Sequence, residues 1–357
     1  MLLSKTVSIF VLVLLCARPV LAEDQNSSSA VSNVDSSRWE PAGPPPVDQA
    51  GTGRRGYVLP ADSADVADPG AHQISVHTVA ANSFYREEAN GFLISQRYEA
   101  HTVAFGFRRG FKVSGFRRVE LGGQIQFHES DNGMLNGFIS GFEGMWVSMT
   151  GSESARNPLR ANAATLPPLG MFITKDNQPV YQAAGHGRGF GDVSLVAKAL
   201  LTDGVAARVA LNVAGASAFS EGNVAGVGLS VDRMLARWAA FHGDLRANIL
   251  LDRVSQWGLP LRRASLAMSA GPELKLTRNS SLGLQIDAGA TPYLPTGAAA
   301  FDEGYGDITF GFNHRVSSGR RPLLVQIYAR ENMNLPFRVR WNTDPDLSIG
   351  MKISVLR

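Results

Sequence analysis

The chain has 357 residues, of which 44% are hydrophobic, a formal net charge of +3 and one cysteine, Cys16. A single cysteine excludes a disulfide framework and a cluster of thiolate metal ligands. The lysines and arginines do not cluster with stacking aromatic side chains, which excludes the usual signature of nucleic-acid binding.

Residues 1–22 have the pattern of a cleaved signal peptide. Lys5 supplies a positive charge, and a mostly apolar run follows from Thr6 to Ala17. That run has the length of a signal-peptide apolar region, whereas a spanning helix needs roughly 20 apolar residues. Small residues precede a cleavage site before Glu23. We therefore expect export, with removal of Cys16.

Residues 23–70 are predicted to form a disordered linker or a periplasmic tail. They contain eight acids and three bases, a local charge of −5, and many prolines and glycines. Such a composition buries too little apolar area to offset the entropy lost on ordering. A plug is the third interpretation of this segment.

From residue 71 to residue 357, polar and apolar residues alternate with a period of two. Between Ser281 and Tyr293, apolar residues such as Leu282 and Ile286 alternate with polar ones such as Gln285. The same period recurs at 119–127, 205–213, 245–251, 264–268, 308–312 and 347–355. Because successive side chains of a strand point to opposite faces, each strand has one apolar and one polar face.

Two architectures fit this pattern: a soluble antiparallel sheet and a transmembrane β-barrel. The alternating segments approach the 9–11 residues that a tilted membrane strand needs, and aromatic residues near their ends resemble an interfacial girdle. We predict an all-β antiparallel transmembrane barrel of about 12 strands, with 10 or 14 as alternatives. The predicted girdle consists of Trp238, Trp257, Tyr293, Tyr305 and Trp341.

One segment, Met134 to Met149, has the helical period instead. Its apolar residues recur at spacings of three and four. We expect an amphipathic helix in a long loop, acting as a plug or gate of the pore or resting on the barrel rim. Its apolar face would include Leu135, Phe138, Ile139, Phe142 and Trp146.

The polar faces of the predicted strands carry charges of both signs. These side chains either pair with one another and fill a narrow barrel or line a selective path for a solute. The predicted lumen-lining residues are Asp192, Lys198, Arg208, Asp232, Arg246, Asp252, Arg263, Glu273, Asp287, Asp307 and Arg330.

Candidate catalytic chemistry is confined to His128 and Ser130, which lie two apart on one face of a strand. That spacing suits a base and a nucleophile, but the sequence has no Gly-x-Ser-x-Gly elbow. The other histidines lack metal-ligand spacing. We expect no metal and no cofactor, and keep a lipid hydrolase only as an alternative.

The order of several landmarks resembles the outer-membrane barrel family known as Domain of Unknown Function 3187. These are Arg97-Tyr98-Glu99, Leu135–Glu143, Gly189-Phe190-Gly191-Asp192, Leu294-Pro295-Thr296-Gly297 and Glu331 with Asp346-Leu347. The resemblance covers residues 72–357 and implies the fold and the outer membrane, with no activity. The sequence departs from the family pattern at Asn136 and Glu143, where an acid and a histidine are usual.

The sequence therefore predicts a non-enzymatic outer-membrane barrel, either a channel for a small solute or a structural barrel. A soluble periplasmic β-protein is the other alternative. Expected partners are outer-membrane lipid and the barrel assembly machinery, without nucleic acid; the oligomeric state is open.

Overall fold

The computed structural model describes residues 39, 41–46, 61–131, 170–184, 187–204, 207–218, 222–255, 258–316, 322–332 and 347–356. Its strands are β1 (His72–Ala89), β2 (Phe92–Phe111), β3 (Val119–Asp131), β4 (Gly170–Lys175), β5 (Gln178–Ala184), β6 (Gly187–Asp203), β7 (Ala207–Ala218), β8 (Gly222–Ala236), β9 (Ala239–Leu250), β10 (Ala264–Lys275), β11 (Ser280–Gly289), β12 (Tyr305–Val316), β13 (Leu323–Asn332) and β14 (Leu347–Leu356). A short helix, α4 (Ala299–Asp302), precedes β12.

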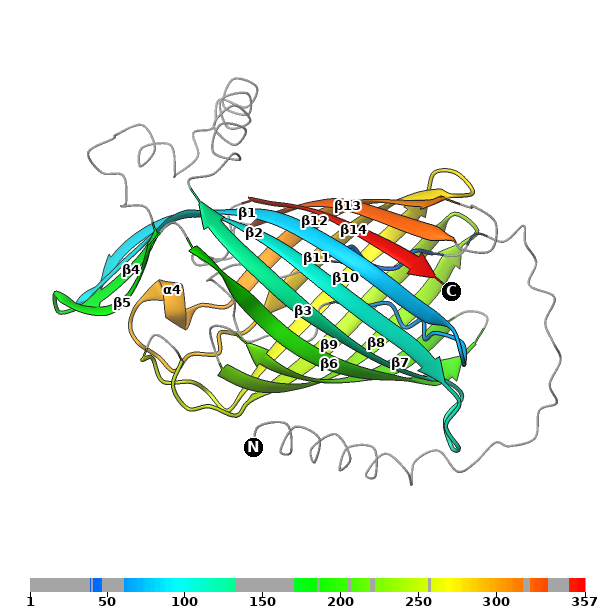
Figure 1. Cartoon of the computed structure of the whole chain (residues 1–357), viewed down its shortest axis with the longest axis horizontal. Helices are drawn as coiled ribbons and strands as arrows, with labels where there is room; N and C mark the ends of the chain where they lie inside the picture. Colours follow the sequence, from blue (N-terminus) through cyan, green and yellow to red (C-terminus); the bar gives the residue numbers. More distant parts are fainter. Residues whose placement is uncertain are drawn as a thin grey trace, which may run out of the picture.

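The strands form one antiparallel sheet that closes on itself (Figure 1). The ring closes where β1 pairs with both β14 and β2. The sheet has 14 strands, and the β4–β5 hairpin lies outside the ring, so the barrel itself has 12. This confirms the predicted fold class and strand number.

The outer face of the barrel is apolar. Leu282 and Ile286 are each 45% exposed, whereas their neighbours Gln285 and Asp287 are buried. The same holds for Leu266 on β10, which is 59% exposed. A sheet with exposed apolar side chains outside and buried polar ones inside is the arrangement of a transmembrane barrel, which counts against the soluble alternative. Among the described residues, no helix is long and apolar enough to cross a membrane.

Two ends of the barrel differ in their connections. At one end, short turns such as 237–238 and 276–279 join neighbouring strands. At the other end, the connections are longer, as at 251–263 and 290–304. The N-terminal part of the chain enters the barrel at the end with short turns, because Pro69 bridges to Gly110 just before β1 begins.

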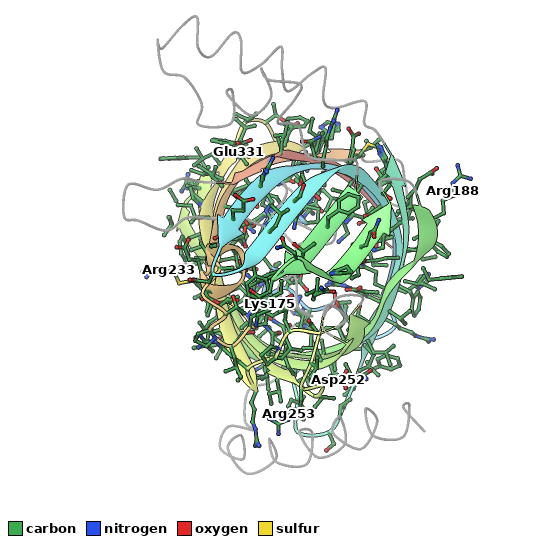
Figure 2. The ribbon with its side chains drawn as sticks, turned by 90° about the vertical axis from the view of Figure 1, so that its left-hand side faces the viewer. Lys175, Arg188, Arg233, Asp252, Arg253 and Glu331 are labelled. Atoms are coloured by element: carbon green, nitrogen blue, oxygen red, sulfur yellow. The ribbon has the colours of Figure 1, made fainter. Side chains whose placement is uncertain are left out.

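A cap covers the end with the longer connections. β1 and β2 extend beyond the ring, and the first six residues of β2 pair with β4 instead of β3. Figure 2 looks into this end and shows these strand ends across the mouth of the barrel. Their apolar side chains, including Phe92 and Ile173, form a buried cluster with Leu261, Tyr293 and Phe301 from the opposite wall.

The tip of the β1–β2 hairpin is fastened to the turn before α4. Asn90 donates a hydrogen bond to the carbonyl oxygen of Gly297, and the amide of Ala299 donates to Glu87 Oε1 at 2.8 Å. Asp302 closes the same turn by accepting from the amide of Thr296 at 2.6 Å. The segment 294–297, one of the landmarks of the family resemblance, is therefore part of the cap.

Candidate functional site

The described parts of the N-terminal segment lie inside the barrel. We call residues 41–46 and 61–70 the N-terminal insert. Within it, Ala64 is fully buried and Val66 is 1% exposed, packed against Leu200 and Ala210 of the wall. Of the three interpretations of residues 23–70, this burial excludes a disordered linker or a free tail for these parts and agrees with a plug. The insert has few apolar side chains, but the wall supplies partners for its polar groups.

Three acidic residues of the insert pair with basic residues of the wall. Asp62 accepts from Arg108 Nη1 at 2.7 Å and from Lys198 Nζ at 2.9 Å. Burial by itself would raise the pKa of Asp62, but the charges of Arg108 and Lys198 outweigh burial and hold that pKa below its usual range. Asp65 pairs with Arg208 at 3.1 Å, and Asp68 with Arg118 at 3.0 Å. Acids at a spacing of three therefore meet bases from β2, β6, β7 and the connection between β2 and β3.

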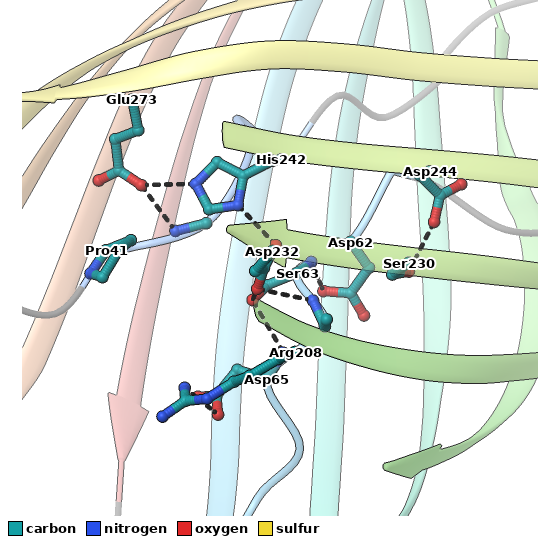
Figure 3. A network of polar contacts seen from close by, with 12 residues as sticks. Pro41, Asp62, Ser63, Asp65, Arg208, Ser230, Asp232, His242, Asp244 and Glu273 are labelled. Carbon is teal, nitrogen blue, oxygen red and sulfur yellow. Dashed lines mark hydrogen bonds and ion pairs between the residues drawn. The ribbon is translucent and has the colours of Figure 1, made fainter. Parts of the chain in front are cut away.

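Backbone amides of the insert bind carboxylates of the wall (Figure 3). The amides of Ala42 and Gly43 donate to the two oxygens of Glu273, at 2.9 and 3.1 Å. The amide of Ala64 donates to Asp232 Oδ2 at 2.8 Å, and the hydroxyl of Ser63 donates to the same oxygen. Glu273 thus holds residues 41–46 of the insert, and Asp232 holds residues 61–70.

His242 joins these two carboxylates. Its Nδ1 lies 2.7 Å from Asp232 Oδ1, and its Nε2 lies 2.9 Å from Glu273 Oε2. Ionised carboxylates only accept hydrogen bonds, so an imidazolium that donates from both nitrogens satisfies this geometry. Asp232 and His242 are directly opposite in the β8–β9 register. The three side chains form a continuous polar band under the insert.

Glycines in the wall make room for the insert. A Cβ atom at Gly311 would lie 2.7 Å from Pro45 Cγ, and one at Gly110 would lie 2.1 Å from the carbonyl oxygen of Asp68. Both distances are shorter than real Cβ contacts. The wall at these two positions therefore accepts the insert only because the side chain is absent.

A second network of charged side chains lies on the inner face of β9, β11, β12 and β13. Arg246 contacts Asp244 at 2.8 Å and Asp287 at 3.5 Å, and both acids also accept from serines of neighbouring strands. Arg330 pairs with Asp307 on the adjacent strand. These pairs lie within the wall rather than between wall and insert: Arg246 reaches from β9 across β10 to Asp287 on β11, and Arg330 and Asp307 join β13 and β12.

The structure places most of the predicted lumen-lining residues inside. Buried on the inner face are Asp192, Lys198, Arg246, Glu273, Asp287, Asp307 and Arg330, with Asp232 largely buried beside them. Arg208 lies at the rim with its side chain 46% exposed. Asp252 accepts from the amide of Asn223 at 2.7 Å at the capped end, and Arg263 is exposed just before β10.

The predicted aromatic girdle is wrong in part. Tyr293 is 3% exposed and Tyr305 is 1% exposed, so neither faces lipid. Tyr293 instead packs edge-on against Phe301 in the cap, with ring centroids 5.4 Å apart. Trp238 is 60% exposed at the β8–β9 turn. Trp257 and Trp341 lie outside the described residues.

Two predicted elements are not tested by the structure, and the predicted catalytic role of His128 loses support. The helix expected within 134–149, with its plug or gate role, and the signal peptide both lie outside the described residues. His128 Nδ1 lies 2.7 Å from Thr102 Oγ1, and the ring packs against Gly191, where a Cβ atom would lie 2.0 Å from Nε2. His128 is thus held by the wall on both sides. Among the described residues, no group of His, Cys, Asp or Glu is arranged to hold a metal.

The plug interpretation of residues 23–70 allowed for a segment inside the barrel, but sequence reasoning missed its partners. Asp62, Asp65 and Asp68 were counted only as part of an acidic linker, although their regular spacing without an intervening base was a usable signal. His242 was treated as an isolated histidine. Its place opposite Asp232 depends on the irregularity between Met234 and Ala236, which shifts the β8–β9 register by one residue and which the sequence pattern does not show.

Comparison with known proteins supports the fold. No family model matches the chain, so the resemblance to Domain of Unknown Function 3187 stays a prediction. No curated protein matches it either. Among solved structures, the chain is similar to an outer membrane channel from Pseudomonas putida F1, with a TM-score of 0.52, 11% identity, and coverage of 82% of this chain and 97% of that one.

Two further structures are more distant. A Pseudomonas aeruginosa FadL homologue has a TM-score of 0.41 at 10% identity, covering 90% of this chain and 98% of that one. The CymD monoaromatic hydrocarbon channel has a TM-score of 0.39 at 12% identity, covering 82% and 89%. At these identities the likeness concerns the architecture of an outer-membrane β-barrel and nothing finer.

Proposed function

We propose that this protein is an outer-membrane channel for small polar solutes, closed at rest by its own N-terminal insert. The observation that carries the proposal is the nature of the contacts between insert and wall. They are mostly ion pairs and hydrogen bonds to Asp62, Ser63, Asp65 and Asp68. The apolar side chains that the described insert buries are small: Pro45, Ala61, Ala64 and Val66. Water can replace polar contacts when the insert leaves, whereas a large apolar core would resist separation.

The orientation follows from the two ends of the barrel. Bacterial outer-membrane barrels have short periplasmic turns and longer extracellular loops. We therefore assign the end with turns 237–238 and 276–279, where the insert enters, to the periplasm. The cap around Tyr293 and Phe301 then faces the outside. A solute would meet the cap first and the insert last.

The interior surface suits transport of polar solutes better than catalysis. Buried Asp, Glu, Lys and Arg side chains line it from several strands, as expected for a wet pore that selects by charge. The similar fold of an outer membrane channel supports the same function. The hydrolase alternative gains nothing from His128, whose ring is held between Thr102 and Gly191.

Conductance in planar lipid bilayers tests the proposal. We expect the full-length protein to be mostly closed, with openings that become frequent when Asp62 and Asp65 are both replaced by asparagine. Heat-modifiable mobility on gels would confirm that each variant is folded. A folded double variant that stays closed, with its insert shown to be released by chemical labelling, would leave the structural-barrel alternative in place.

A further inference from the structure

The insert is an acidic peptide bound in a basic site. Between residues 61 and 70 it carries Asp62, Asp65 and Asp68 and no base. The wall groups that pair with these acids are Arg108, Arg118, Lys198 and Arg208. Their acidic partners on the wall are Glu120 and Asp203. In direct ion pairs among the described residues, these four bases therefore meet two wall acids and three insert acids. The wall acids Asp232 and Glu273 instead bind amide and hydroxyl donors of the insert.

Lys198 marks the centre of this site. Its side chain is 2% exposed, and its Nζ donates both to Asp62 Oδ2 at 2.9 Å and to the carbonyl oxygen of Asp65 at 2.8 Å. Arg108 approaches the same carboxylate oxygen of Asp62 at 2.7 Å. Removal of the insert would open this ammonium and guanidinium to the water of the lumen, and an anion of matching geometry would bind both by charge-assisted hydrogen bonds in place of Asp62.

We propose that small polycarboxylates bind this basic site in competition with the insert, and that they are the solute class of the channel. A carboxylate would take the place of Asp62 between Arg108 and Lys198, and a second would take the place of Asp65 at Arg208. Amide or hydroxyl donors on the solute would bind Asp232 and Glu273, as Ala64 and Ala42 do now. This inference rests on the proposed channel function.

Because solute and insert compete for one site, binding of the solute would itself open the channel. A ligand that binds only the barrel without its insert shifts the population toward the open form by its binding free energy. A neutral or cationic solute has no such preference for a site with four bases. Solute class and gating thus share one set of side chains.

Chemical labelling of the insert tests the competition directly in the full-length protein. The only natural cysteine is Cys16, so an Ala61→Cys substitution in a Cys16→Ser background introduces a single reporter thiol. Ala61 is 7% exposed and lines a small cavity beside His242 and Glu273, which leaves room for the sulfur. The measured quantity is the rate of maleimide modification of the folded protein in detergent.

We expect citrate to raise the labelling rate saturably, by about tenfold at a concentration about ten times its dissociation constant. Sodium chloride at the same ionic strength and spermidine should have little effect, since screening of buried pairs is weak. Lys198→Met should abolish the response to citrate, Lys198→Arg should keep it, and Arg253→Gln on the exposed β9–β10 connection should leave it unchanged. Arg253 is the matched control because it is exposed and outside the site.

The results separate the two proposals. A labelling rate that citrate does not change, or that sodium chloride raises equally, overturns the polycarboxylate inference whatever the conductance. Citrate-dependent labelling in a protein that never conducts supports the binding site and refutes the channel. If Lys198→Met does not fold, Arg108→Gln provides the same test from the other side of Asp62.

Discussion

Replacement of Asp62 by asparagine removes the charge that Arg108 and Lys198 share while keeping the side chain's size. The insert would stay covalently attached to β1 and could still use its amide bonds to Asp232 and Glu273. We expect the barrel to fold normally and the insert to leave the lumen more often. The buried guanidinium and ammonium lose their common partner, which is the main cost of the change.

The size of the effect follows from the distances and burial of this pair. At 2.7 Å and an effective dielectric of ~20, the gross attraction of Asp62 to Arg108 is about 6 kcal/mol. Most of this attraction is offset by desolvation, and removal of one partner from a buried pair costs about 3–5 kcal/mol. The Asp62 side chain is 22% exposed, so the lower end applies. About 3 kcal/mol corresponds to a roughly 100-fold rise in the ratio of undocked to docked insert.

Two graded controls come from the same insert. The Asp65 side chain is 63% exposed and that of Asp68 is 73% exposed. Exposed pairs contribute about 0–1 kcal/mol, so Asp68→Asn should raise the ratio by at most about fivefold. Open probability in bilayers and maleimide labelling at position 61 both report the ratio. Equal effects of the three substitutions, or no effect of Asp62→Asn in a folded protein, would refute the assignment of Asp62 as the main anchor.

Three further outcomes are expected. Gly311→Ala should destabilise docking, because its Cβ would lie 2.7 Å from Pro45 Cγ, and should raise the open probability, whereas Gly189→Ala on β6, with no atom near its Cβ, should not. Phe301→Ala should reduce the stability of the cap by about 3–5 kcal/mol and expose the β4–β5 hairpin to added protease. The heat-modifiable mobility of the barrel should stay the same. A hairpin that remains uncut would argue against an apolar cap. The pKa of Asp62 is held below its usual range, so its ion pairs are lost only as pH falls through that lowered pKa. Acidification from pH ~7.5 to ~5 should therefore not open the channel through Asp62. Opening in that interval that disappears in Asp62→Asn would contradict this account.

The barrel wall was predictable from the sequence because a period of two leaves a strong local pattern. Leu282, Ile286 and Asp287 already show which face is lipid and which is lumen, and their exposures agree. Strand number followed from the length of chain available. None of this needed knowledge of distant contacts, since side-chain alternation is a property of the single strand.

The insert and the cap were not predictable in the same way. Ala64 and Val66 are too few and too small to give a periodic signal, and their burial depends on Leu200 and Ala210, far along the chain. Tyr293 illustrates the same limit. An aromatic residue near a strand end suggests a membrane interface, yet the outward extension of β1 and β2 covers it. Tertiary contacts between segments far apart in the chain decided both cases.

The wide distribution of the insert's partners has a consequence for the order of folding. Its contacts come from β2, β6, β8, β10 and, through Arg315 bonded to the carbonyl oxygen of Pro41, β12. These strands surround one space only after β1 has met β14. Contacts between residues so far apart in sequence form late, because the entropy of closing long loops must be offset first. We therefore expect the insert to dock last, so that its docking would report that the ring of strands is complete.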